Sequence, residues 1–133
     1  MQPIAFTLGE DDFAALASYF AKLPPKLGTV APQAKRDAIE RSQVIAEQGL
    51  PASNMPPCAS CHTDGAYPTY PKLAGQHADY MAGQLRLWRQ GVRTTTAEGQ
   101  IMAPVAKALS DAQIADVAAY YESLPPERDE ALR

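Results

Sequence analysis

Four stretches of the chain carry apolar side chains at the three- and four-residue spacing of a single helix face. These stretches are residues 10–23, 35–48, 75–90 and 111–124. The 12 prolines interrupt the chain often, so the helices should be short and joined by extended segments. The composition is rich in alanine, and β-branched residues are scattered, which favours helices over strands. The pattern therefore predicts an all-α protein.

The last of these helices has the clearest boundaries. Ser110 and Gln113 are placed as a capping box, in which each side chain bonds to the backbone amide of the other residue. The apolar stripe that follows consists of Ile114, Val117, Ala118 and Tyr121. Pro125 and Pro126 should end the helix because proline cannot continue it.

Glycines and polar segments mark the ends of the other helices. Gly49 and Gly91 suit the C′ positions directly after the second and third helices. The inward side of the third helix is expected to consist of Tyr80, Met81, Leu85 and Trp88. Residues 94–99 are polar and predict a surface loop, and residues 100–104, which contain a proline, predict a non-helical lead into the last helix.

The start of the chain repeats its end at an offset of 101 residues, since residue 3 aligns with residue 104 and residue 25 with residue 126. Ten of the 25 aligned positions are identical, namely Met1/Met102, Pro3/Pro104, Ala5/Ala106, Leu8/Leu109, Ala14/Ala115, Ala17/Ala118, Tyr19/Tyr120, Leu23/Leu124, Pro24/Pro125 and Pro25/Pro126. Amphipathic helices share some pattern by chance, but the Met, Pro and Leu-Pro-Pro matches do not follow from periodicity. The repeat predicts that residues 1–27 are the end of a preceding domain of the same type, residues 28–34 a linker, and residues 35–133 one domain.

Composition narrows the class of protein only slightly. The net charge of −3 gives no reason to expect nucleic acid or a membrane surface as a partner. No apolar run reaches the roughly 18 residues that a membrane-spanning helix requires. The first residues also lack the basic start and apolar stretch of a signal peptide.

The residues with the most specific chemistry are Cys58-Ala59-Ser60-Cys61-His62, a C-x-x-C-H motif of the kind that attaches haem c covalently. Each thiol adds across one vinyl group of the porphyrin, and His62 is placed to bind the iron. A zinc site would need four ligands, whereas the chain has no other cysteine and one other histidine, His77. A thioredoxin-like pair would need a βαβ context, and a disulfide across two residues would leave His62 unexplained. The motif therefore predicts one haem c.

A second axial ligand must come from a segment that folds over the opposite haem face. We expect Met102, which lies 102 − 62 = 40 residues after His62, to supply it from a loop. Met1 lies in the N-terminal appendage, Met55 is close to Cys58 in sequence, and Met81 falls within a predicted helix. The alternatives are that Met102 only packs in the core, or that His77, expected two residues into the third helix, is the ligand.

With these features the chain resembles a class I c-type cytochrome, and more narrowly the C-terminal half of the tandem di-haem cytochromes c of the bacterial periplasm. The residues that carry the resemblance are Cys58–His62, the run Tyr70-Pro71-Lys72-Leu73-Ala74-Gly75-Gln76 and the run Ile101-Met102-Ala103-Pro104-Val105-Ala106. The resemblance implies short helices wrapped around one covalently bound haem, with an extra N-terminal helix here.

The resemblance also implies roles for single residues. Cys58 and Cys61 would form the thioethers, with His62 and Met102 as the axial iron ligands. The carbonyl of Pro71 would accept a hydrogen bond from the free ring N–H of His62, which orients a ligating histidine. Where this family usually has a small residue at the crossing of its first and last helices, this chain has Ser42.

Three further residues have two readings each, and two tyrosines have one. Trp88 either packs in the core or against the haem, or donates a hydrogen bond to a haem propionate. Arg89 and Arg93 either lie on a solvated helix face or pair with a propionate or an acidic partner. Tyr120 and Tyr121 are expected to pack where the last helix crosses the first.

A haem with both axial positions filled has no open site for a substrate, and axial methionine raises the reduction potential. The prediction is a periplasmic electron carrier of a respiratory chain rather than an enzyme. A quinol-oxidising complex or dehydrogenase would be its donor, a terminal oxidase or reductase its acceptor, and the N-terminal helix offers a surface for self-association. The alternatives are a haem c subunit or domain of a dehydrogenase or oxidase complex, and haem catalysis with a displaceable methionine.

Overall fold

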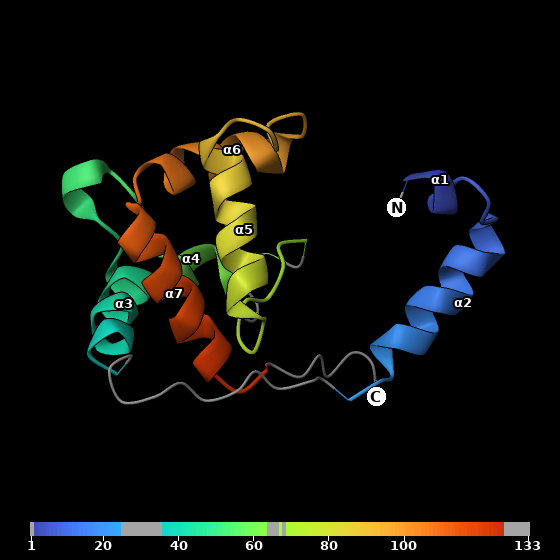
Figure 1. Cartoon of the computed structure of the whole chain (residues 1–133), viewed down its shortest axis with the longest axis horizontal. Helices are drawn as coiled ribbons and strands as arrows, with labels where there is room; N and C mark the ends of the chain where they lie inside the picture. The colour runs from blue at the N-terminus through green and yellow to red at the C-terminus, as the bar shows by residue number, and fades with distance from the viewer. Residues whose placement is uncertain (1, 25–35, 64–66, 68, 127–133) are drawn as a thin grey trace. The chain divides into compact units, whose positions relative to one another are not determined.

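The computed structural model describes residues 2–24, 36–63, 67 and 69–126, and helices are the main regular secondary structure among them (Figure 1). Two compact units are present, and each is described by itself. The larger unit contains α3 (Arg36–Gln48), the 3₁₀ turn η2 (Pro51–Ser53), α4 (Ala59–His62), α5 (Ala78–Arg89), α6 (Ala97–Lys107) and α7 (Asp111–Ser123). The smaller contains α1 (Gln2–Ala5) and α2 (Glu10–Ala21). Within the described residues the sheet-type pairing is limited to one isolated bridge between Leu50 and Met55, so the all-α prediction is confirmed.

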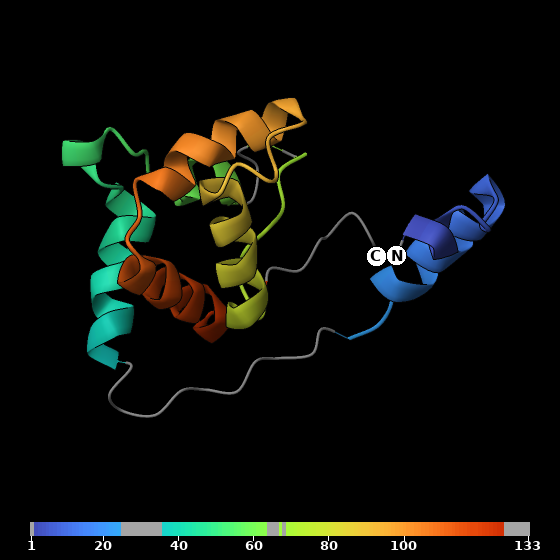
Figure 2. The same ribbon diagram turned by 45° about the horizontal axis from the view of Figure 1, so that its top comes forward.

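Helix α7 is the centre of the larger unit. It packs against α3 on one side and α5 on another, and α5 also packs against α6 (Figures 1 and 2). The predicted stripe of α7 is buried, with Ile114 fully inaccessible to solvent. The capping box is present, because Gln113 N donates to Ser110 Oγ over 3.2 Å and Ser110 N donates to Gln113 Oε1 over 2.9 Å. Local sequence and tertiary packing therefore agree in this helix.

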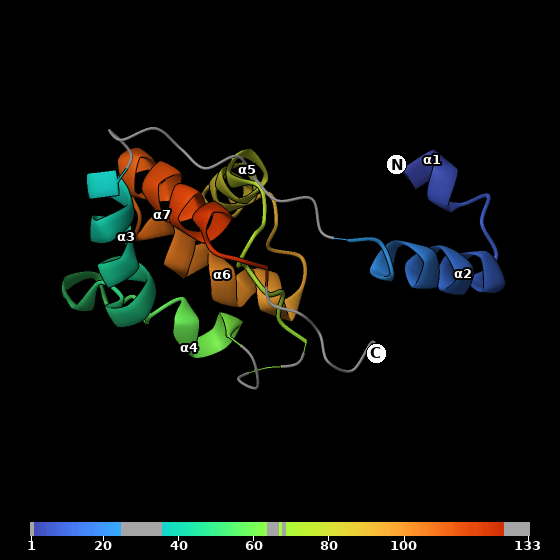
Figure 3. The same cartoon turned by 90° about the horizontal axis from the view of Figure 1, so that it is seen from below.

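The crossing of α3 and α7 is close, as Figure 3 shows from below. Ser42 on α3 is fully buried, as its assignment to the crossing position predicts. Its hydroxyl oxygen is buried without a hydrogen-bond partner among the described residues. A small side chain lets the two backbones approach, while the polar atom loses its hydration.

Helix α5 begins later than predicted, at residue 78 rather than 75. Gly75 adopts a left-handed conformation with φ +77°, and its amide donates to the carbonyl of Tyr121 over 2.8 Å. The amide of Ala78 then donates to the Glu122 carboxylate over 3.1 Å, so a residue distant in sequence caps the helix. Tyr80, predicted to point inward, is more than half exposed, whereas Met81 is buried.

The prediction of a loop over residues 94–104 was wrong for most of its length, because α6 occupies residues 97–107. Thr96 is the N-cap, and its hydroxyl accepts a hydrogen bond from Gly99 N over 3.1 Å. Gly99 is buried against the chain, since a Cβ there would lie 2.3 Å from the Arg93 carbonyl oxygen. Pro104 sits inside the helix, where it removes one intrahelical hydrogen bond without ending the helix.

The smaller unit repeats several backbone hydrogen bonds of the last two helices at the offset of 101 residues. Phe13 N donates to Gly9 O as Ile114 N donates to Ser110 O, and Leu23 N donates to Phe20 O as Leu124 N donates to Tyr121 O. Helix α2 starts and ends within one residue of the position that the offset of 101 predicts from α7. None of its residues is buried, and its exposed apolar residues are Phe13, Leu16, Tyr19 and Phe20.

Several predictions fall outside the described residues. They are the linker at residues 28–34, the alignment of Met1 with Met102, and the C-terminal limit of the domain at residue 133. Among the helices that are described, none is both long enough and apolar enough to cross a bilayer.

Candidate functional site

The C-x-x-C-H motif forms a single helical turn. The carbonyl oxygen of Cys58 accepts hydrogen bonds from Cys61 N over 3.2 Å and from His62 N over 3.0 Å. The Thr63 hydroxyl donates to the carbonyl of Ala59 over 2.7 Å at the end of this turn. Both cysteines are unpaired thiols, which excludes a disulfide between them in this structure. One short turn thus presents Cys58, Cys61 and His62 together.

A hydrogen bond fixes the imidazole ring of His62. Its Nδ1 lies 2.7 Å from the carbonyl oxygen of Pro71, the contact that the resemblance implies. Since a carbonyl only accepts, Nδ1 carries the proton and Nε2 keeps its lone pair. Tyr70 lies beside the ring, with centroids 6.0 Å apart, and stacks on Tyr67 at 5.1 Å. The ring is therefore oriented with the nitrogen that binds metals in its basic form.

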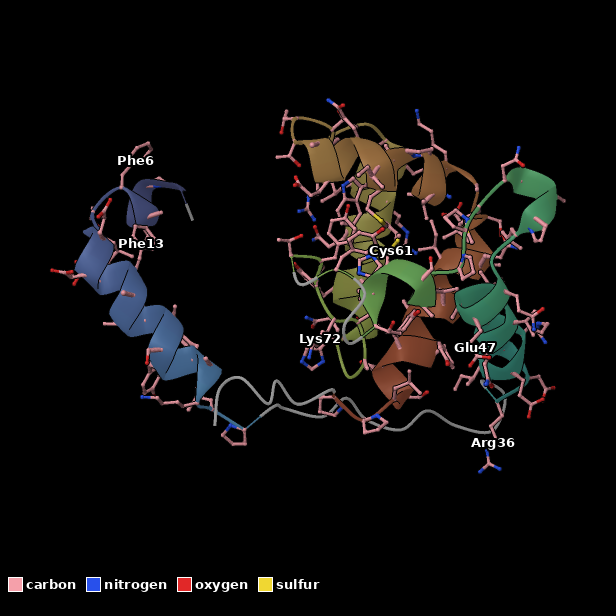
Figure 4. All side chains as sticks on the ribbon, turned by 180° about the vertical axis from the view of Figure 1, so that it is seen from behind. Phe6, Phe13, Arg36, Glu47, Cys61 and Lys72 are labelled. Carbon is pink, nitrogen blue, oxygen red and sulfur yellow. The ribbon has the colours of Figure 1, made fainter. Side chains whose placement is uncertain are left out.

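A largely apolar cavity of about 350 Å³ lies against this turn. Its walls include Cys58, Cys61 and His62 from one side and Met102 from α6. Figure 4 shows Cys61 on α4, with its side chain among those gathered between α4, α5 and α6. The fold thus brings the predicted haem-binding residues to one cavity, although Met102 projects from a helix rather than from the predicted loop.

Trp88 and its neighbours form one polar part of the cavity wall. The indole Nε1 of Trp88 is buried and has no hydrogen-bond partner among the described residues. Arg93 lies over the indole ring at 4.3 Å and donates a hydrogen bond to the side-chain oxygen of Gln84. All three residues line the cavity. Gln84 was not singled out from the sequence, although it lies one helical turn before Trp88.

The other polar candidates lie away from the cavity. Arg89 Nη2 lies 2.5 Å from Asp111 Oδ1, and Arg86 Nε lies 4.0 Å from the same atom. Arg89 therefore pairs with an acidic residue of its own chain and ties α5 to the start of α7. His77 is the N-cap of α5 rather than a residue within it, with Nδ1 3.8 Å from Glu122 Oε1. It is not among the described residues that line the cavity.

Tyr121 is a cavity residue that sequence reasoning placed only in the helix crossing. Its side chain lines the cavity together with Cys58. Burial raises the pKa of the Cys58 thiol, and the neighbouring Tyr121 side chain acts in the opposite direction. The signal in the sequence is weak, because Tyr121 belongs to the apolar stripe that packs α7 into the core. Tyr120 faces α3 instead, where burial and then the nearby Glu47 carboxylate raise the pKa of its hydroxyl.

These residues fit a covalently attached haem c. Two thiols on one turn, a histidine with an available Nε2 and a methionine share one apolar cavity. The buried indole N–H of Trp88 requires an acceptor that the described residues do not provide, and a haem propionate is an acceptor of the right charge. The fit thus rests on both the attachment residues and an otherwise unsatisfied polar atom.

The chain is similar to known proteins over this region and beyond it. The family model for cytochrome c matches residues 55–125. Cytochrome c4 of Azotobacter vinelandii is 37% identical over 119 residues, covering 86% of this chain and 55% of that protein. The thiosulfate dehydrogenase electron acceptor of Stutzerimonas stutzeri is 31% identical over 128 residues, covering 93% of this chain and 58% of that protein.

Comparison with a solved structure points to the same family. Cytochrome c4 of Acidithiobacillus ferrooxidans superimposes with a TM-score of 0.75 at 32% identity, over 93% of this chain and 71% of that one. The chain thus spans a little more than half the length of the two curated relatives above. The expected class I cytochrome fold and its covalently bound haem c are confirmed, and the chain belongs to the cytochrome c family.

Proposed function

We propose that this protein is a one-electron carrier and not an enzyme. The observation that carries the proposal is the cavity in which Cys58, Cys61, His62 and Met102 meet. Haem c supplies an iron that gains and loses one electron. With a nitrogen ligand on one face and a sulfur ligand on the other, no iron position is left for a substrate, which suits electron transfer rather than catalysis.

Each residue has a part in this function. Cys58 and Cys61 would hold the porphyrin through thioethers, and His62, whose Nδ1 donates a hydrogen bond to the Pro71 carbonyl, would bind the iron through Nε2. Met102, which lies on α6, would supply the second iron ligand. Trp88 would donate its unpaired indole N–H to a propionate. The apolar lining of the cavity keeps water from the iron, which lowers the reorganisation that accompanies each electron transfer.

The matched pair Met102→Leu and Met81→Leu tests the axial assignment. Both methionines line the cavity, and leucine preserves their volume while removing the sulfur. Met102→Leu should abolish the Met-to-iron charge-transfer band of the oxidised protein and lower the reduction potential, whereas Met81→Leu should keep both. An unchanged band in Met102→Leu would overturn the assignment. If the band of the unsubstituted protein persisted after cyanide is added, this would further argue against haem catalysis.

We also propose that residues 1–27 are the end of a preceding haem domain, followed by a linker over residues 28–34 and a haem domain over residues 35–133. The in-register repeat of hydrogen bonds between α1–α2 and α6–α7 supports it. So do relatives named cytochrome c4, which match nearly the whole chain yet extend beyond it. A second C-x-x-C-H motif in the gene upstream of residue 1 would test this reading directly.

The carrier would work in the periplasm, because haem c is attached outside the cytoplasm. Its donor would be a quinol-oxidising complex or dehydrogenase, and its acceptor a terminal oxidase or reductase. The relative named as a thiosulfate dehydrogenase electron acceptor favours a second candidate, a haem c subunit or domain of such a dehydrogenase system. Co-purification of a dehydrogenase with the haem-loaded chain would favour this candidate over a freely diffusing carrier.

A further inference from the structure

The segment that leads into α5 is fastened to the C-terminal end of α7. Gly75 N donates to the carbonyl oxygen of Tyr121 over 2.8 Å. Three residues later, Ala78 N donates to the carboxylate of Glu122 over 3.1 Å, and the Glu122 side chain is only 22% exposed. Two successive residues of α7 thus hold the backbone of this segment at two points.

Pro126 closes the same contact and leaves Gly75 no room for a side chain. Gly75 has a φ of +77°, and a Cβ there would lie 2.8 Å from Pro126 Cβ and 2.9 Å from Pro126 Cα. Pro126 belongs to the Leu-Pro-Pro sequence that occurs twice in the chain, which electron transfer alone does not explain. In the larger unit, this proline therefore packs the end of α7 directly against the backbone at Gly75.

The fastened segment also carries the carbonyl that orients His62. The carbonyl oxygen of Pro71, four residues before Gly75, lies 2.7 Å from His62 Nδ1. A hydrogen bond from Gln76 N to Leu73 O over 3.1 Å closes the turn between them, and Leu73 packs against the hydrophobic core. A displacement at Gly75 is therefore transmitted to the Pro71 carbonyl through a short and packed stretch of backbone.

The hydrogen bond between His62 and Pro71 affects the two oxidation states of a bound iron unequally. A carbonyl that accepts the Nδ1 proton of a ligating histidine makes the imidazole a stronger electron donor. A stronger donor stabilises oxidised iron, which carries more positive charge, more than reduced iron. A short bond therefore lowers the reduction potential, and a longer one raises it.

We propose that Gly75 and Glu122 are positioning residues, whose contacts at the end of α7 hold the Pro71 carbonyl against His62 and thereby lower the reduction potential of the haem. Neither Gly75 nor Glu122 is among the described residues that line the cavity, so their effect passes through Pro71. The inference rests on ligation of the iron by His62, as proposed above.

The first test compares Gly75→Ala with Gly91→Ala in the haem-loaded chain. Both glycines are left-handed, with φ +77° and +76°, so alanine introduces the same backbone strain at each. A Cβ at Gly91 has no neighbour within 4 Å among the described residues, whereas at Gly75 it meets Pro126. Only Gly75→Ala should therefore displace the Pro71 carbonyl.

We expect the equilibrium constant for reduction to rise about threefold in Gly75→Ala, because the hydrogen bond to His62 is weakened rather than removed. For a one-electron couple this corresponds to about 30 mV in a potentiometric titration. Exchange of the His62 Nδ1 proton with solvent, measured by NMR in the reduced protein, should become faster. Gly91→Ala should change neither quantity.

A second pair, Glu122→Ala and Glu122→Gln, decides the question even if Gly75→Ala does not fold. Both substitutions remove the same negative charge, but glutamine keeps a side-chain oxygen that can accept the hydrogen bond from Ala78 N. The equilibrium constant for reduction should be about twofold higher in Glu122→Ala than in Glu122→Gln, or about 20 mV.

Three results would each refute the proposal: an unchanged potential in Gly75→Ala, an equal shift in Gly91→Ala, or equal potentials in the two Glu122 variants. Loss of the Met-to-iron band in Gly75→Ala would refute it as well, because the substitution would then act through the other axial ligand. The axial assignment itself fails by a different result, an unchanged band in Met102→Leu. The two failures are therefore distinguishable in one set of proteins.

Discussion

Helices α2 and α7 have closely similar sequences and the same local structure, yet they differ in what surrounds them. Ile114 on α7 is 0% exposed, whereas Phe13, its counterpart on α2, is 49% exposed. Both helices begin with a capping arrangement at corresponding positions and form corresponding backbone hydrogen bonds. The sequence pattern alone therefore specifies the helix, but the burial of its apolar face depends on a partner surface, which α3 and α5 supply to α7.

The largest effect that this comparison predicts is in the response to truncation of the two apolar faces. Ile114→Ala should lower the free energy of unfolding by about 2–5 kcal/mol, because it leaves a cavity in a packed core. Phe13→Ala should change it by no more than about 0.5 kcal/mol, as expected for an exposed site. Urea unfolding of the haem-loaded chain measures both. A large loss in Phe13→Ala would show that the face of α2 is covered in solution.

The N-caps offer a smaller and more local test. Ser110→Ala should cost about 1 kcal/mol, because Gln113 N loses its side-chain acceptor. The corresponding Gly9 has no side-chain cap, and its extended conformation accepts a side chain, since a Cβ there would lie 3.6 Å from the nearest atom. Gly9→Ser should therefore stabilise α2 by a few tenths of a kcal/mol.

Circular dichroism and amide hydrogen exchange within α2 measure the gain, and the urea midpoint measures the loss in Ser110→Ala. Unchanged exchange in Gly9→Ser would mean that the local frame of α2 differs from that of α7. Because Gly9 and Ser110 occupy corresponding positions, a gain at one and a loss at the other would show that the same capping interaction operates in both copies.

The contrast between α2 and α7 also explains which features of the fold could be predicted from the sequence. Features that depend on neighbouring residues were predicted, such as the capping box at Ser110 and the glycines Gly49 and Gly91 after the helices, which adopt a left-handed conformation. The attachment motif is equally local, since one turn presents Cys58, Cys61 and His62.

Features that depend on residues distant in sequence could not be predicted from local patterns. The start of α5 moved because Glu122 caps Ala78. Tyr121 was assigned to helix packing because no local pattern indicates that it also lines the cavity. Helix α6 is a separate case, since its cap at Thr96 and the contact of Gly99 with Arg93 are local, and it formed across Pro104. Apart from α6, the residues that were missed or misplaced are those whose role is set by a second segment of the chain.

A further effect, smaller than that of Ile114→Ala, is expected where α7 crosses α3. The Ser42 hydroxyl is buried in the α3–α7 crossing without a partner among the described residues, so Ser42→Ala removes an unsatisfied polar atom. We expect the free energy of unfolding to rise by about 0.5–1 kcal/mol, less than the full cost of burying a hydroxyl because the cavity left behind offsets part of the gain. The exposed Ser18 on α2 is the matched control, since Ser18→Ala changes only local helix propensity. A lower urea midpoint in Ser42→Ala would mean that its hydroxyl is hydrogen-bonded in solution, and the crossing would then depend on a polar contact rather than on small size.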